Sequence, residues 1–239
     1  MISVAVLGAS GRMGSLALEL IDADANLSLH AAINSSTSPE AMLGADVVLD
    51  FTRPDVSSEL VAFAIDNDMK VVVGTSGWSE VKLDSLKPAL AAHPNAAVLV
   101  VPNFSIGSML AQNFAAQAAK FFGSVEIIET HHSHKVDSPS GTAIRTAELI
   151  SQSKAAQPLI PGVGQPARGQ IVAGVPIHSL RIEGVSAKQD VVFGGSDEVL
   201  VLSHDVSSHR AYSHGILLAI NHVLESKGLT IGLDAVIGR

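Results

Sequence analysis

The stretch Gly8-Ala9-Ser10-Gly11-Arg12-Met13-Gly14 stands between an apolar run at residues 2–7 and a segment whose apolar residues have helical spacing. The first pattern predicts a buried strand and the second a helix. In such a turn Gly8 permits the tight bend, Gly11 the close approach of a pyrophosphate, and Gly14 the close packing of helix against strand. The position of the glycines therefore favours a dinucleotide-binding loop over a βα turn without a ligand.

The residues around this loop bear on the choice of cofactor. The start of the helix presents backbone N–H groups and the positive end of its dipole to phosphates, and Arg12 adds a charge there. The acid that usually binds the ribose is expected about 20 residues further on, where this chain has Asn34 followed by three hydroxyl residues. Asn34 carries no charge to repel a 2′-phosphate, so the sequence is compatible with NADH or NADPH. Arg53 is either a compensating charge at the nucleotide or a surface cation.

The pattern of elements changes near the middle of the chain. Short apolar runs and helical patterns alternate up to about residue 104, which predicts βαβ units in a parallel sheet. Later strand-like runs follow one another without helices, which predicts a second, mixed sheet. The expected strands are 2–7, 27–33, 45–51, 70–75, 96–101, 125–131, 176–183, 188–193 and 198–204, and the expected helices are 13–21, 54–67, 80–92, 105–122, 141–154 and 208–226, with a Pro- and Gly-rich loop at 157–169.

These patterns predict an α/β fold class, with a Rossmann-like parallel-sheet nucleotide domain and a second α+β domain built on a mixed sheet. Residues 1–104 together with 211–239 are expected to form the dinucleotide-binding domain. Residues 105–210 are expected to form a substrate-binding and oligomerisation domain. Because few helices cover the second sheet, its other face is expected to be buried by association of subunits.

Composition argues against several classes of function. Hydrophobic residues make up 47% of the 239 residues and charged residues 16%, which favours a buried core over disorder. The net charge of −8 argues against a nucleic-acid partner, and no apolar stretch approaches the roughly 18 residues of a membrane span. The chain has no Cys, which excludes disulfide and thiolate chemistry. No signal peptide is recognisable, so a cytoplasmic location is expected.

The densest chemistry lies in Glu129-Thr130-His131-His132-Ser133-His134-Lys135-Val136-Asp137-Ser138-Pro139-Ser140-Gly141-Thr142-Ala143, where three histidines and a lysine fall within five residues. Ser140 is expected to cap a helix whose first N–H groups bind a carboxylate. Lys135 neutralises a carboxylate as a mobile point charge, and a histidine donates a proton near neutral pH. The segment is therefore expected to hold a dicarboxylate and to protonate it.

The pattern E-x-H-H-x-x-K-x-D-x-P-S-G-T-A in this segment resembles the signature of the dihydrodipicolinate reductase family. The resemblance extends in order over nearly the whole chain. It includes Gly11-Arg12-Met13-Gly14, Asp50-Phe51-Thr52-Arg53-Pro54, Val73-Gly74-Thr75-Ser76-Gly77 and Pro102-Asn103-Phe104-Ser105-Ile106-Gly107.

This resemblance implies a role for individual residues. His131 would be the proton donor and acceptor, and Lys135 a second proton donor and a substrate contact. The substrate would be held by His132, Ser140, Gly141 and Thr142. The cofactor would be lined by Gly8, Ala9, Ser10, Gly11, Arg12, Met13, Gly74, Thr75, Ser76, Val101, Pro102, Asn103 and Phe104, and by Asn34, which stands where the family often has an acid.

The resemblance also implies a reaction. Hydride from NADH or NADPH would add to an imine-like ring carbon, and a positioned acid would protonate the adjacent carbon. The family converts the hydroxylated tetrahydrodipicolinate to tetrahydrodipicolinate in lysine and diaminopimelate biosynthesis, and its members form homotetramers through the second sheet. The implied partner is therefore a small cyclic dicarboxylate, without nucleic acid, membrane or metal.

The residues leave other readings open. A related dehydrogenase of an acyclic amino or oxo acid would not need the Ser-Gly-Thr helix start, and an NAD(H)-binding redox sensor would not need His131 or Lys135. His132 and His134 would share a strand face, a spacing found in zinc sites, but no further ligand is evident and Lys135 would repel the cation. Trp78 is expected to pack in a core or interface rather than to wall the nicotinamide pocket.

Overall fold

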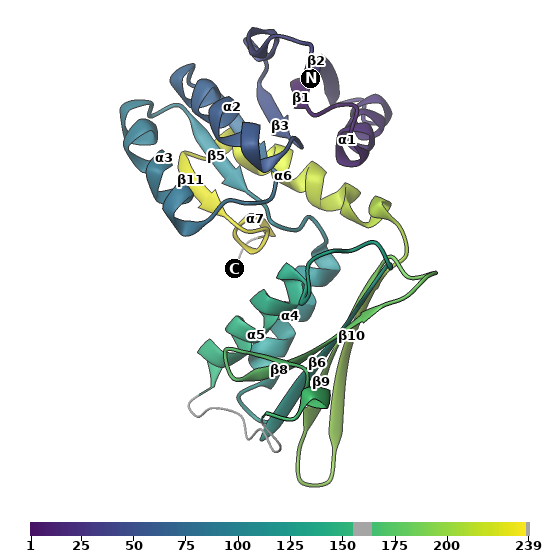
Figure 1. The fold of residues 1–239 in the computed structure, drawn as a ribbon. Helices are drawn as coiled ribbons and strands as arrows, with labels where there is room; N and C mark the ends of the chain where they lie inside the picture. Colours follow the sequence, from purple (N-terminus) through teal and green to yellow (C-terminus); the bar gives the residue numbers. More distant parts are fainter. Residues whose placement is uncertain (155–163, 238–239) are drawn as a thin grey trace. The chain divides into compact units, whose positions relative to one another are not determined.

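The computed structural model describes residues 1–154 and 164–237. Its contacts divide the chain into two compact units (Figure 1). Unit 1 comprises Met1–Ile106 and His209–Arg239, and unit 2 comprises Gly107–Ser208. Unit 1 is therefore assembled from both ends of the chain, and unit 2 is an insertion within it.

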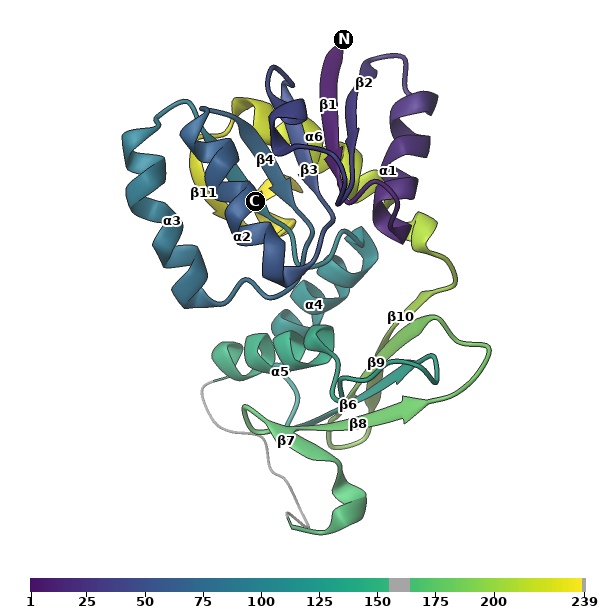
Figure 2. The ribbon, with the colours of Figure 1, turned by 45° about the horizontal axis from the view of Figure 1, so that its top comes forward.

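Unit 1 is built on a sheet of six strands in the order β11-β5-β4-β3-β1-β2, and every adjacent pair is parallel. Helices α1 and α6 cover one face and α2 and α3 cover the other (Figure 2). A Rossmann-like parallel-sheet domain is thus confirmed. The elements are β1 (Ile2–Leu7), α1 (Arg12–Ala23), β2 (Leu27–Ile33), β3 (Val47–Asp50), α2 (Pro54–Asp66), β4 (Lys70–Val73), α3 (Glu80–Ala92), β5 (Ala97–Val100), α6 (Ser213–Glu225), β11 (Gly228–Ile231) and the short α7 (Asp234–Ile237).

Alternate residues of the central strands enter opposite layers of the core. In β1, Val4 and Val6 pack with α1 and α6, whereas Ala5 and Leu7 pack with α2 and α3. A strand that is buried on both faces is apolar at every position. This is why the central strands appear in the sequence as continuous apolar runs rather than as alternating ones.

Unit 2 contains a mixed sheet of five strands in the order β10-β9-β6-β8-β7, in which only β6 and β8 are parallel. Helices α4 and α5 pack on one face through Ala115, Ala143 and Ile150. The opposite face carries exposed Ile128, Leu180, Val199 and Val201. Among the described residues no helix combines the length and the apolar composition that a membrane crossing requires. The elements are α4 (Ile106–Ala118), β6 (Ser124–His131), α5 (Gly141–Ser153), β7 (Gln170–Val172), β8 (Val175–Arg181), β9 (Ala187–Gly194) and β10 (Val199–Val206).

Most predicted elements are confirmed to within a few residues, and the clearest errors lie near the C-terminus. The helix expected at 208–226 begins only at Ser213, because a 3-10 turn (His209–Tyr212) precedes it. The sequence does not predict β11, because Gly228 and Thr230 interrupt its apolar residues, yet it pairs with β5 along its whole length. Residues 157–163 of the expected loop at 157–169 lie outside the described residues. The rest of this loop contains a 3-10 turn (Pro166–Arg168), and the unpredicted β7 follows it.

A buried carboxylate ties together the loops at the end of β3 and β4. Asp50 has no solvent exposure, and its Oδ1 accepts from the Thr52 backbone N–H at 3.0 Å, the Thr52 hydroxyl at 2.5 Å and the Thr75 hydroxyl at 3.0 Å. Its Oδ2 accepts from the Ser57 hydroxyl at the start of α2. A buried charge must be surrounded by donors in this way, so Asp50 holds three chain segments in one arrangement.

We expect Asp50→Ala to lower the free energy of unfolding by about 3 kcal/mol, because several buried donors lose their acceptor. Chemical denaturation followed by circular dichroism measures the change. The matched control is Asp55→Ala, which removes an exposed carboxylate paired with Arg53 and should change stability by less than about 1 kcal/mol. Equal effects of the two substitutions would contradict the assigned role of Asp50.

Helix α6 approaches the chain after β5 so closely that only glycine fits at Gly215. A Cβ at this position would lie 2.0 Å from the Phe104 carbonyl oxygen, which belongs to the backbone and cannot turn aside. We expect Gly215→Ala to destabilise unit 1 by about 1–3 kcal/mol through overpacking, seen as a lower melting temperature. Gly123→Ala is the control, since its Cβ meets nothing within 4 Å; an unshifted melting temperature for Gly215→Ala would refute this packing.

Candidate active site

The residues predicted to bind the cofactor follow the carboxyl ends of adjacent strands in unit 1. The strand order reverses at β1, with β2 on one side and β3 on the other. In open α/β sheets ligands bind outside the carboxyl ends of the strands at such a switch point. The predicted residues follow β1 (Gly8 to Met13), β2 (Asn34), β4 (Gly74 to Ser76) and β5 (Val101 to Phe104), and Arg53 follows β3.

The glycine-rich loop has the close contacts that the sequence predicts. Gly8 has a φ of 74°, and a Cβ there would lie 2.4 Å from the Phe51 carbonyl oxygen. A Cβ on Gly14 would lie 2.2 Å from the Gly8 carbonyl oxygen, so the start of α1 packs directly on the loop. Gly11 is the N-cap of α1, and no side chain caps this helix. The N–H groups of its first turn are thus presented to an anion, and the loop fits a pyrophosphate.

Asn34 shapes the turn that follows β2. Its Oδ1 accepts from the Ser36 backbone N–H at 3.0 Å, the Ser36 hydroxyl at 2.7 Å and the Thr37 hydroxyl at 3.3 Å. The amide oxygen is therefore occupied within its own loop. The group that Asn34 has left for a ligand is its NH2, a donor, which suits either a hydroxyl or a phosphate oxygen.

The loops after β4 and β5 expose only some of the predicted residues. The Thr75 hydroxyl is buried and donates to Asp50, and the side chains of Val101 and Phe104 lie in the core. Gly74 lies against the rings of Phe51 and Phe104, and a Cβ there would come within 2.7 Å of both. Ser76 and Pro102 are exposed. A ligand at this edge would therefore meet backbone atoms and small side chains rather than the Thr75, Val101 or Phe104 side chains.

Contacts within unit 1 show where the side chains of Trp78 and Arg53 lie. Trp78 packs against the core beneath α2 and α3, and its Nε1 donates to Ser57 Oγ at 3.1 Å. The expected packing role of Trp78 is confirmed. Arg53 is exposed and pairs with Asp55 at 2.9 Å, which leaves its guanidinium at the surface.

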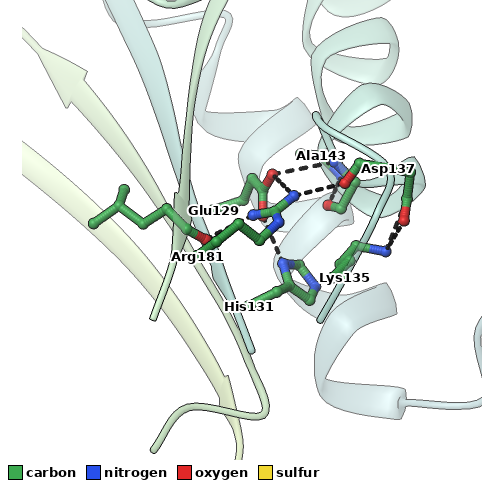
Figure 3. Close-up of polar contacts among 8 residues, drawn as sticks. Glu129, His131, Lys135, Asp137, Ala143 and Arg181 are labelled. Carbon is green, nitrogen blue, oxygen red and sulfur yellow. Dashed lines mark hydrogen bonds and ion pairs between the residues drawn. The ribbon is translucent and has the colours of Figure 1, made fainter. Parts of the chain in front are cut away.

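In unit 2 the predicted catalytic segment runs from the end of β6 to the start of α5 (Figure 3). His131 is the last residue of β6. Ser140 is the N-cap of α5, as predicted, and its hydroxyl accepts from the Ala143 N–H at 3.2 Å. Gly141 is exposed and Thr142 is partly buried in the first turn. The helix start, with its N–H groups, therefore lies on the same segment as His131 and Lys135.

His131 is half-buried and contacts a buried carboxylate. Its Nδ1 lies 2.5 Å from Glu129 Oε2. Burial lowers the pKa of His131, the Glu129 carboxylate raises it part of the way back, and the charges of Lys135 and Arg181 lower it further. An imidazole held against a carboxylate in this way has the chemistry of a general acid or base.

The cations of the segment are held by carboxylates. Lys135 Nζ lies 2.6 and 2.8 Å from the two oxygens of Asp137, and this contact lowers the pKa of the Asp137 carboxyl. Burial would raise the pKa of Glu129, but hydrogen bonds from Arg181, Ser179 and His131 outweigh it and hold that pKa below its usual range. Glu129 is therefore ionised at neutral pH.

The expected geometry of the neighbouring histidines is wrong. Strand β6 ends at His131, so His132 and His134 lie in the following turn rather than on one strand face. Both are exposed, with ring centroids 6.4 Å apart. Within residues 1–154 and 164–237 no group of three or more His, Asp or Glu side chains is arranged to hold a metal ion.

The roles of Glu129 and Arg181 were not predicted from the sequence. Arg181 donates to both oxygens of Glu129, at 2.8 and 2.9 Å, although 52 residues separate them. The parallel pairing of β6 and β8 sets His131 opposite Arg181. Glu129 stands within the motif as a charged residue on a predicted strand, which is a signal for a buried ion pair, whereas nothing in the sequence marks Arg181 as its partner.

Comparison with known proteins covers both units. The family model described as dihydrodipicolinate reductase, N-terminus, matches residues 2–104, and the model described as dihydrodipicolinate reductase, C-terminus, matches residues 107–237. A Clavibacter michiganensis subsp. michiganensis protein named 4-hydroxy-tetrahydrodipicolinate reductase is 47% identical over 98% of this chain and 86% of its own length. A protein of the same name from Cutibacterium acnes is 41% identical over 100% of this chain and 99% of its own.

The comparison also extends to solved structures. Dipicolinate-bound dihydrodipicolinate reductase from Paenisporosarcina sp. TG-14 is similar with a TM-score of 0.84 and 31% identity, covering 98% of each chain. GenD2 from gentamicin A biosynthesis, solved in complex with NAD, shares the fold with a TM-score of 0.64 and 15% identity, covering 99% of this chain and 90% of its own. With its nucleotide-binding unit 1, this chain is an oxidoreductase that uses a nicotinamide nucleotide, and it belongs to the dihydrodipicolinate reductase family.

Proposed function

We propose that this protein is a 4-hydroxy-tetrahydrodipicolinate reductase of lysine and diaminopimelate biosynthesis, which reduces a small cyclic dicarboxylate to tetrahydrodipicolinate. The observation that carries the proposal is the segment from Glu129 to Thr142, which combines a proton-carrying imidazole, an ammonium group and a capped helix start. These groups match the needs of a dianionic ring that must be bound and then protonated.

Unit 1 would hold the nucleotide. The uncapped start of α1 and the backbone contacts of Gly8 and Gly14 leave room and N–H donors for the pyrophosphate. The nicotinamide would lie near the loops after β4 and β5, with Gly74 giving a close approach. When bound, the reduced nicotinamide supplies the hydride.

Unit 2 would hold the substrate. The N–H groups of Gly141 and Thr142 lie at the positive end of α5 and suit one carboxylate. Lys135, whose backbone N–H donates to the His132 carbonyl oxygen at 3.1 Å, would pair with the other carboxylate together with His132. Since Lys135 already pairs with Asp137, a substrate carboxylate would displace or share that contact.

The protonation step would use His131. Hydride addition to the ring imine carbon leaves an electron pair that moves into the ring as an enamine, and the adjacent carbon then takes up a proton. With Nδ1 directed at Glu129, the His131 atom that gives this proton is Nε2. Lys135 would be a second proton donor, and its charge would stabilise the dianion throughout.

We further propose that the enzyme accepts both NADH and NADPH, works in the cytoplasm and forms a homotetramer. The uncharged Asn34 amide supports dual cofactor use. The exposed apolar residues on the face of the unit 2 sheet that α4 and α5 leave uncovered support assembly, because a face of this kind is usually buried against a partner.

We expect His131→Gln and Lys135→Ala each to reduce kcat at least about 100-fold, because each removes a group that transfers or stabilises the proton. The Kd for the nucleotide should stay within about twofold of the wild-type value, since unit 1 is unchanged. The assay supplies the unstable substrate with the upstream synthase and follows loss of nicotinamide absorbance. Equilibrium binding gives the Kd.

The matched control is His134→Gln, which alters an exposed histidine of the same turn and should leave kcat nearly unchanged. Full turnover in both His131→Gln and Lys135→Ala would disprove the assigned roles. Tight nucleotide binding without any turnover by the wild-type protein would instead favour a redox sensor. Activity on acyclic substrates alone would favour a related dehydrogenase.

Cofactor choice gives a separate prediction for Asn34→Asp. The aspartate keeps the acceptor for the Ser36 and Thr37 donors but adds a negative charge where the 2′-phosphate would lie. We expect KM for NADPH to rise about tenfold, the effect of roughly 1.4 kcal/mol of repulsion, with KM for NADH little changed. The control is Asn95→Asp, which lies just before the amino end of β5, whereas Asn34 follows the carboxyl end of β2. Equal changes in KM for NADH and NADPH in Asn34→Asp would argue against this site.

A further inference from the structure

We infer that Glu129, clamped by Arg181, is a positioning residue that sets which nitrogen of His131 carries the exchangeable proton and where the Lys135 loop lies. The inference rests on the proposed function for its catalytic meaning. The geometry itself belongs entirely to unit 2 and is drawn in Figure 3.

Glu129 is a buried carboxylate. Its side chain has no exposure to solvent, yet a chain of donors surrounds both oxygens. Arg181 contacts Oε1 at 2.8 Å and Oε2 at 2.9 Å, the Ser140 N–H contacts Oε1 at 3.3 Å, and His131 Nδ1 contacts Oε2 at 2.5 Å. A bidentate guanidinium fixes a carboxylate in direction as well as in place.

The Glu129 carboxylate sets the tautomer of His131. An ionised carboxylate only accepts hydrogen bonds, so the Nδ1 that faces Glu129 must carry a hydrogen. Proton gain and loss are then confined to Nε2. The charged groups that act on this imidazole are Glu129, Lys135 and Arg181. Of these, Glu129 contacts Nδ1 at 2.5 Å, and only Glu129 favours the protonated form.

Arg181 also connects Glu129 to the loop that carries Lys135. Besides Glu129, Arg181 Nη2 donates to the Asp137 carbonyl oxygen at 2.7 Å. The Asp137 carboxylate in turn holds Lys135 Nζ. Glu129 also accepts from the N–H of Ser140, which caps α5. The Glu129–Arg181 pair therefore contacts His131, the Ser140 N–H and the Asp137 carbonyl directly, and it reaches Lys135 through Asp137.

The test compares Glu129→Gln and Arg181→Lys with wild type. Glu129→Gln keeps the shape but removes the charge, and Arg181→Lys keeps the charge but cannot span both Glu129 oxygens and the Asp137 carbonyl. We expect kcat to fall about 100-fold in Glu129→Gln, as for a small misplacement of a reacting group, with a smaller fall in Arg181→Lys and an unchanged Kd for the nucleotide. The matched control is Glu126→Gln, on the same strand and paired with His178 at 2.7 Å, which should keep kcat within about twofold.

The dependence of kcat on pH distinguishes a positioning role of Glu129 from a role in stabilising the fold alone. The reaction needs protonated His131, so kcat falls as pH rises through the pKa of this group. Without the Glu129 charge that pKa is lower, and the fall in kcat should move to lower pH in Glu129→Gln. A purely structural pair would lower the amount of active enzyme at every pH and leave the profile in place, which would overturn the inference.

The tautomer is read directly by nitrogen-15 NMR of the imidazole, assigned with His131→Gln. We expect wild-type His131 to carry its neutral-form hydrogen on Nδ1 and both variants to lose this preference. This readout does not need turnover, so it tests the clamp even if the wild type fails to reduce the cyclic substrate, a result that would refute the proposed function alone. If Glu129→Gln does not fold, the result for Arg181→Lys tests the inference by itself. A wild-type His131 with its hydrogen on Nε2 would overturn the inference. An unaltered tautomer together with full kcat in the folded variants would overturn it as well.

Discussion

A carboxylate that is wholly removed from water must be surrounded by hydrogen-bond donors, and each unit of this protein contains one, Asp50 in β3 and Glu129 in β6. Both lie at or near the carboxyl end of a strand, where the loops that bear the candidate site begin. Asp50 gathers hydroxyl and N–H groups from the loops after β3 and β4. Glu129 gathers a guanidinium, an imidazole and the N–H of a helix cap. In each unit the need to satisfy one buried charge thereby sets the loop conformation.

This arrangement explains why the candidate catalytic groups can be close to the surface and still well ordered. His131 and Lys135 retain some exposure, as groups that meet a substrate must, and their partners beneath them are buried or anchored to buried groups. A directed imidazole requires less reorganisation when it transfers a proton. The same reasoning applies to unit 1, where exposed Ser76 follows a buried Thr75 that is bonded to Asp50.

The fold was largely predictable because its main signals are local. Continuous apolar runs indicate strands buried on both faces, and glycines at Gly8, Gly11 and Gly14 indicate the turn between β1 and α1. The strands that the sequence did not predict, β7 and β11, lack the three successive apolar residues that each of β3, β4 and β5 contains. They exist because a sheet edge supplies their hydrogen bonds.

The sequence by itself determined which chemical groups are available: a glycine turn for a pyrophosphate, and a segment with histidine, lysine and a Ser-Gly-Thr helix start. It also determined that Asn34 brings no charge to the end of β2. Only the tertiary structure decided that Glu129 meets Arg181, that Thr75 faces Asp50 rather than a ligand, and that His132 and His134 leave the strand. The physical reason is that motifs report residues near each other in the chain, whereas the partner of a buried charge is chosen by strand pairing, here across 52 residues.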